Sequence, residues 1–227
     1  MTSERSSRPA LGPATIARPL GVFCAATFAV AWMTWNETPG RSILAPMVWV
    51  LAAWLPMARD RWLPRHLGLT GPELVRGLRY YALTTLVLVP VLGGGFWLYG
   101  RAGLPLHTAP SHIDVPMWEW IVYQLVVIAV SEELFFRGYL QGRLEQIASQ
   151  KGLRAGGVLW LPIAASALFF ALAHVVVDLS LARLAVVMPG LLFAWLRGRS
   201  GSLLAPMLAH GTANVLAMLA MAHVSSG

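Results

Sequence analysis

The residues best suited to chemistry are ionisable side chains inside apolar segments. Glu132, Glu133 and Arg137 lie in the apolar run IVYQLVVIAVSEELFFRGYLQGRLEQ. An ionisable side chain within a membrane helix costs about 3 kcal/mol even on the mildest scale, so such groups mark a functional site by default. Glu133 and Arg137 are four residues apart, so we expect them to share a helix face and pair. Glu132, rotated by about 100° from Glu133, has no such partner.

Two further apolar segments each carry a histidine at a helical spacing. His174 follows Phe170 by four residues, and Asn214 follows His210 by four residues. The second pair therefore points off one face of its helix. Polar side chains of this kind can serve simply to join helices within a membrane. Phe170 on its own is most simply a packing residue.

Glu132 and His174 are placed symmetrically about a predicted turn. The polar, glycine-rich run QKGLRAGG at 150–157 is the obvious turn between the helices that carry them. Both positions are equally far in sequence from residue 153, within this turn. In an antiparallel helical hairpin, residues equidistant from the turn lie at one depth, so we expect Glu132 and His174 to face each other.

Together these groups are suited to hydrolysis of an amide. A carboxylate and an imidazole on opposite walls can hold one water molecule and take its proton. A second imidazole and an amide NH₂ are donors that can stabilise the oxyanion formed when water adds to a carbonyl group. The sequence contains no HExxH motif, which excludes a zincin-type metalloprotease.

The elements that must position these groups are membrane helices. Of the 227 residues, 57% are apolar and 12% are charged, against about a quarter charged in soluble domains. This composition excludes a disordered chain and an ordinary soluble enzyme. We predict an all-α fold, a polytopic transmembrane helix bundle of about seven helices, with a range of six to eight. The apolar blocks, most of them near the length that crosses a bilayer, are 19–36, 43–58, 78–99, 116–139, 157–177, 179–197 and 202–223.

The positive charge indicates how the chain is oriented. The formal net charge is +7, and such an excess is also typical of nucleic-acid binding. Here the basic residues lie between apolar blocks, mostly in the segments that fall inside if the N-terminus is inside. By the positive-inside rule we expect a cytoplasmic N-terminus and no nucleic-acid partner.

Three short motifs, all on apolar segments, match a known pattern. They are EExxxR at 132–137, FxxxH at 170–174 and HxxxN at 210–214. In these motifs and their order the sequence resembles the CPBP family, which contains the type 2 CAAX prenyl proteases and bacteriocin-processing enzymes and has Abi-like members. The resemblance covers roughly residues 116–217. It implies a glutamic intramembrane endopeptidase.

The resemblance also implies a role for each motif position. Glu132 would activate water together with His174, and His210 and Asn214 would form the oxyanion hole. The supporting residues would be Glu133, Arg137 and Phe170. No cofactor is implied, although a divalent metal such as zinc stays open as an alternative. The outer-loop residues His107, His112 and Asp114 are expected to be a solvated loop rather than a metal cluster.

We therefore expect the chain to have two parts. Residues 1–115 would form N-terminal transmembrane helices, with an interfacial element near 62–77. Residues 116–227 would form a CPBP-like catalytic helical core. The expected substrate is a membrane-associated protein or peptide, cleaved within a C-terminal sorting segment or a CAAX-like segment. Arginine-rich loops and alanine richness favour a bacterial inner membrane, with the lipid bilayer as the other partner. The alternatives are a non-catalytic membrane immunity protein or scaffold and a proton-coupled transporter, since buried Glu and His also serve proton relays.

Overall fold

Seven continuous helical rods make up the part of the chain that the computed structural model describes, residues 15–60, 64–101, 115–153 and 159–225. No β-strand occurs among these residues. The rods coincide with the seven apolar blocks, which confirms the predicted all-α bundle. Five helices are long and apolar enough to cross a membrane, and Leu204–Leu219 is a shorter apolar helix.

The helices follow one another with short connections. The first three are α1 (Ala17–Trp35), α2 (Arg41–Arg59) and α3 (Gly71–Arg101), with a 3₁₀ turn η1 (Pro64–Leu67) before α3. The fourth rod is a composite of α4 (Met117–Val122), η2 (Tyr123–Ile128), α5 (Ala129–Glu133), η3 (Leu134–Gln141) and α6 (Gly142–Gln150). The last three are α7 (Trp160–Asp178), η4 (Leu181–Val186) continued by α8 (Val187–Ser200), and α9 (Leu204–Ser225).

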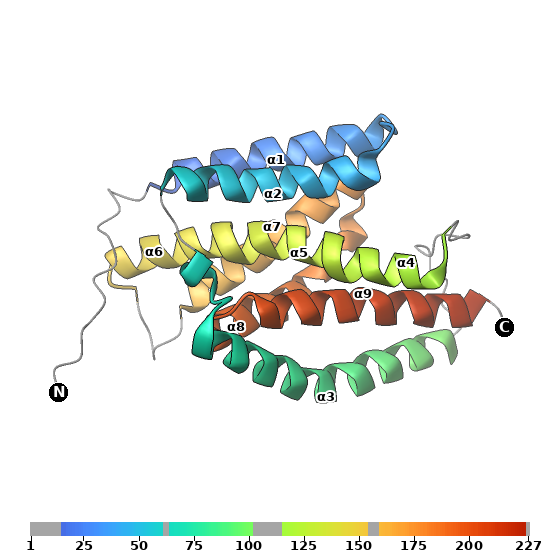
Figure 1. Ribbon diagram of the computed structural model, residues 1–227. Helices are drawn as coiled ribbons and strands as arrows, with labels where there is room; N and C mark the ends of the chain where they lie inside the picture. Colours follow the sequence, from blue (N-terminus) through green and yellow to red (C-terminus); the bar gives the residue numbers. More distant parts are fainter. Residues whose placement is uncertain (1–14, 61–63, 102–114, 154–158, 226–227) are drawn as a thin grey trace.

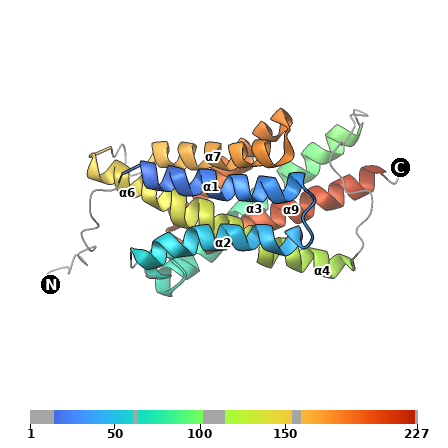
Figure 2. The same ribbon diagram turned by 90° about the horizontal axis from the view of Figure 1, so that it is seen from above.

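The composite rod runs through the middle of the bundle. In Figure 1 the antiparallel pair α1 and α2 covers one side of it, and the curved α3 lies along α9 on the opposite side. Helix α7 packs against α1, α8 and η3, and α9 packs against η2 and α5. Figure 2 shows that α1 begins at the end of the bundle where α6 lies, whereas α9 ends at the other end, where α4 lies. The motif-bearing helices α7 and α9 therefore both pack against the composite rod.

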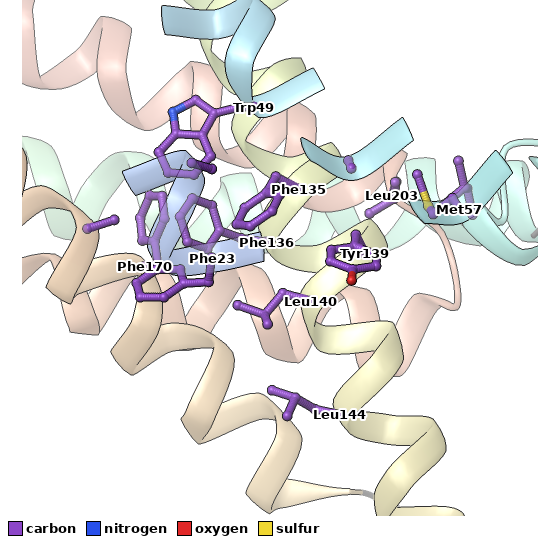
Figure 3. Packing of buried hydrophobic residues seen from close by; sticks show 14 of the residues in the cluster. Phe23, Trp49, Met57, Phe135, Phe136, Tyr139, Leu140, Leu144, Phe170 and Leu203 are labelled. Atoms are coloured by element: carbon purple, nitrogen blue, oxygen red, sulfur yellow. The ribbon is translucent and has the colours of Figure 1, made fainter. Parts of the chain in front are cut away.

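A buried aromatic cluster fixes the composite rod against its neighbours (Figure 3). Phe135 and Phe136 on η3 pack on Trp49 of α2, with ring centroids 4.9 and 5.1 Å apart. Phe136 also meets Phe170 of α7 edge to face, at 5.0 Å. Edge-to-face aromatic pairs are favourable beyond the area that they bury. The cluster lies directly after Glu132 and Glu133, so it holds the first motif in place.

The region 62–77, which we expected to form a short interfacial element, is only partly separate from the long helix α3. The short turn η1 is distinct, but α3 begins at Gly71 and continues without a break, so residues 71–77 belong to a long helix. The end of η1 is fastened to the connection between α8 and α9: Leu203 N donates to Leu67 O at 2.9 Å, and Ser202 Oγ donates to Gly68 O. Gly68 has φ +63°, and a Cβ there would lie 1.9 Å from the carbonyl oxygen of Gly201. Glycine is required at this position, and the fastening sets where α9 starts.

Candidate active site

The two glutamates lie between two π-helical segments. Glu132 and Glu133 are the last residues of the short α5, with η2 before them and η3 after them. A π-helix is rare and occurs frequently at functional sites, because its wider turn re-aims side chains that an α-helix would place elsewhere. The α-helical spacing used for the sequence predictions therefore does not hold along the whole rod. No residue pattern in the sequence announces these segments.

Glu133 and Arg137 form the ion pair that their spacing predicts. Arg137 Nη1 donates to Glu133 Oε1 at 2.8 Å, and both side chains are fully buried. Arg137 Nη2 donates to the carbonyl oxygen of Gly190 on α8 at 3.0 Å, and its guanidinium lies 4.3 Å from the centroid of the Phe170 ring. A buried charge is tolerated when it is paired and hydrogen-bonded. The pair thus joins η3 to α7 and α8.

His210 lies against both glutamates. Its Nδ1 is 2.8 Å from Glu133 Oε1, and its Nε2 is 3.8 Å from Glu132 Oε2. The ring stacks on Phe193 with centroids 4.9 Å apart and an interplanar angle of 15°. The Glu133 carboxylate, which also accepts a hydrogen bond from Arg137, has no hydrogen to donate, so the Nδ1 of His210 must carry the hydrogen of this bond. No spacing or motif predicts this contact, because its partners are 77 positions apart.

Glu132 carries a buried carboxylate oxygen, Oε2. Its side chain is 15% exposed, and Oε2 is buried with no hydrogen-bond partner within the part of the chain that the structure describes. The 3.8 Å separation from His210 Nε2 exceeds a direct hydrogen bond. A buried acceptor without a partner carries a desolvation cost, so this oxygen is suited to receive a donor from water or substrate.

His174 projects from α7 beside Phe170. Its Nδ1 lies 2.9 Å from the carbonyl oxygen of Phe170, and the two rings are 4.5 Å apart, edge to face. A carbonyl oxygen only accepts, so Nδ1 carries the hydrogen and, in the neutral ring, Nε2 is left as an acceptor. The Phe170 ring is also 5.6 Å from that of His210, so it bridges the two imidazoles. That Glu132 and His174 face each other stays a prediction.

Asn214 lies one helical turn after His210 on α9, as expected from the spacing. Its Nδ2 donates to Oε1 of Gln124, on η2, at 2.9 Å. Gln124 belongs to none of the three motifs, and the sequence analysis missed it. It lies eight residues before Glu132 in a run of apolar residues, and its polar side chain in that context was the signal that could have found it.

Metal ligands do not gather in the described part of the chain. Among residues 15–60, 64–101, 115–153 and 159–225, no group of three or more His, Cys, Asp or Glu side chains could hold a metal ion. The outer-loop residues His107, His112 and Asp114 lie outside the described residues.

Comparison with known proteins agrees with the motifs. Residues 114–216 match the family model Rce1-like, described as type II CAAX prenyl endopeptidase Rce1-like. Neither curated proteins nor solved structures give a match to the chain. The matched range contains every predicted site residue and confirms the resemblance seen in the sequence. With five helices of membrane-spanning length, the molecule is an integral membrane protein. Over residues 114–216 the chain therefore carries an Rce1-like domain of the type II CAAX prenyl endopeptidase family.

Proposed function

We propose that this protein is a glutamic intramembrane endopeptidase that hydrolyses a peptide bond in a membrane-associated protein or peptide. The observation that carries the proposal is the buried Oε2 of Glu132, which has no hydrogen-bond partner among the described residues and lies 3.8 Å from Nε2 of His210. The Rce1-like domain supports peptide hydrolysis in general. His174, His210 and Asn214 are the other polar groups that this proposal assigns to the addition of water to a carbonyl.

In the first step, Glu132 acts as the general base. A water molecule donates one hydrogen to Glu132 and is held by a second polar group, for which His174 is the proposed partner. Nε2 of His174 is an acceptor because Nδ1 donates to the Phe170 carbonyl. As the proton moves to Glu132, the water oxygen bonds to the carbonyl carbon and the carbonyl oxygen becomes an oxyanion.

In the second step, donors stabilise that oxyanion and the peptide bond breaks. Asn214 Nδ2 has one hydrogen left after donating to Gln124. His210, whose Nδ1 lies 2.8 Å from Glu133 Oε1, is the second proposed donor, through Nε2 when both of its ring nitrogens carry a hydrogen. The proton held by Glu132 then passes to the leaving nitrogen as the C–N bond breaks, giving a carboxylic acid and an amine. Glu133 and Arg137 are supporting residues in this scheme.

The substrate class proposed is a CAAX-like or C-terminal sorting segment at the membrane surface. An intramembrane site suits such a segment, because the substrate segment can reach the enzyme by moving within the bilayer. The segment would then be cleaved at a depth that water reaches. We also propose that the protein resides in a bacterial inner membrane with a cytoplasmic N-terminus, from the distribution of basic residues between the helices. No resident cofactor is proposed.

The test uses the purified protein in liposomes and three fluorophore-quencher peptides. One ends in a farnesylated CAAX sequence, one is the same peptide without the farnesyl group, and one ends in an apolar helix followed by basic residues. Cleavage of at least one, with the cut bond located by mass spectrometry, is the expected result. Ser131→Ala is the control variant, which should cleave like the wild type, because the Ser131 hydroxyl only donates to the Ile128 carbonyl within the composite rod. Intact peptides in every case would favour the non-catalytic alternative.

A further inference from the structure

Asn214 is held by a residue outside the three motifs. Nδ2 of Asn214 donates to Oε1 of Gln124 at 2.9 Å, across 90 positions of sequence. Both side chains are half-buried, one on α9 and one on η2. A terminal amide can turn about its last side-chain bond, and a hydrogen bond to a fixed acceptor removes that freedom. The contact therefore sets the plane of the Asn214 amide.

Gly211 makes the contact possible by letting η2 approach α9. A Cβ at position 211 would lie 3.0 Å from Cα of Leu125 and 2.5 Å from its Cδ2. The Cδ2 atom of Leu125 can turn aside, but its Cα is backbone and cannot, so a larger residue at position 211 would push the two helices apart. Figure 1 shows the composite rod running alongside α9 in this region. The spacing between Gln124 and Asn214 thus depends on a glycine that directly follows His210.

We propose that Gln124 is a positioning residue for the hydrolysis, and this rests on the proposed function. The Asn214 amide has two hydrogens. Gln124 accepts one, and the other is directed to the oxyanion. Gln124 and Glu132 belong to one composite rod, so a single element carries both the general base and the group that orients an oxyanion donor. A displacement of that rod would misalign both together.

The first test is kinetic, with the farnesylated CAAX peptide as probe. Gln124→Leu keeps a similar volume and removes the acceptor. The expected result is a fall in kcat of about 10-fold, the size of one aligned hydrogen bond, with KM unchanged. The matched control is Gln150→Leu, at an exposed position near the end of α6, which should retain the wild-type kcat. A Gln124→Leu protein with the wild-type kcat would overturn the proposal.

A double-mutant cycle separates positioning from a merely structural role. In an Asn214→Ala background, Gln124→Leu should lower kcat no further, because the amide that it orients is gone. If Gln124 only supported the fold, the same substitution would lower kcat by the same factor in both backgrounds. That result would overturn the proposal.

A thermal cycle tests the contact without any activity. The melting temperatures of the wild type, both single variants and the double variant are compared in detergent. A hydrogen bond between the two side chains predicts that the shift of the double variant is smaller than the sum of the single shifts. Additive shifts would overturn the inference alone. A wild type that leaves every peptide intact would instead overturn the proposed function, while the thermal cycle would still decide whether the contact exists.

Discussion

Removing the charge of Arg137 should destabilise the protein strongly, because its carboxylate partner would remain buried. Both side chains of the Glu133–Arg137 pair are fully buried. Arg137→Met keeps much of the side-chain length but leaves the buried carboxylate of Glu133 without its guanidinium partner. Breaking a buried ion pair in this way costs about 3–5 kcal/mol. At about 2–4 °C per kcal/mol for a chain of this size, the melting temperature should fall by about 6–20 °C.

The second substitution in this experiment restores the balance of charge. Glu133→Gln in the Arg137→Met background removes the unpaired carboxylate, yet its amide oxygen can still accept from His210. The double variant should therefore regain more than half of the lost stability, because an isosteric neutral replacement of a buried pair is often near neutral. Such a recovery would show that Arg137→Met loses stability because the Glu133 charge is unpaired, and not because packing is lost.

The matched control is an exposed ion pair of the same residue types. Arg76 and Glu73 pair at 3.4 Å with side chains 48% and 41% exposed. Arg76→Met should cost less than about 1 kcal/mol, since solvent screens such pairs. Thermal unfolding in detergent, followed by tryptophan fluorescence, gives the melting temperatures of the wild type, Arg137→Met, the double variant and Arg76→Met. Equal shifts for Arg76→Met and Arg137→Met, or a double variant less stable than Arg137→Met alone, would refute the reasoning.

Three further outcomes are expected. Asn214→Ala should lower kcat for the farnesylated peptide about 100- to 1000-fold, which is the usual loss for one oxyanion donor. A change in KM with an unchanged kcat would contradict this role. Gly68→Ala should abolish the monodisperse peak in size-exclusion chromatography, because its Cβ would lie 1.9 Å from the Gly201 carbonyl oxygen, whereas Gly21→Ala, with nothing within 4 Å, should leave the peak unchanged. Dialysis against EDTA should leave the cleavage rate unchanged, and a loss restored by Zn²⁺ would instead establish the zinc alternative.

Local periodicity was sufficient to predict the helices and one of the site contacts. Apolar blocks of bilayer length become helices because the backbone must satisfy its own hydrogen bonds in lipid. The Glu133–Arg137 pair followed from a spacing of four residues within one helix, and the structure shows it. Both inferences need only information within a few turns of the chain.

Contacts between distant helices could not be read in the same way. The position of His210 against Glu133 and the bond between Asn214 and Gln124 depend on how α9 packs on the composite rod. That packing depends on the π-helical segments η2 and η3, which shift the register of side chains and have no signature in composition. Motif spacing therefore predicts which residues belong to the candidate site, but not which atoms meet there.

The central claim is that the carboxylate of Glu132 takes the proton of the attacking water. The most direct measurement is the kcat of Glu132→Gln with the farnesylated peptide, in protein whose melting temperature matches the wild type. Glutamine keeps the volume and the hydrogen-bonding capacity but cannot accept the proton. The account predicts a loss of at least about 100-fold, the lower range for a general base. Cleavage by Glu132→Gln at the wild-type rate would contradict it.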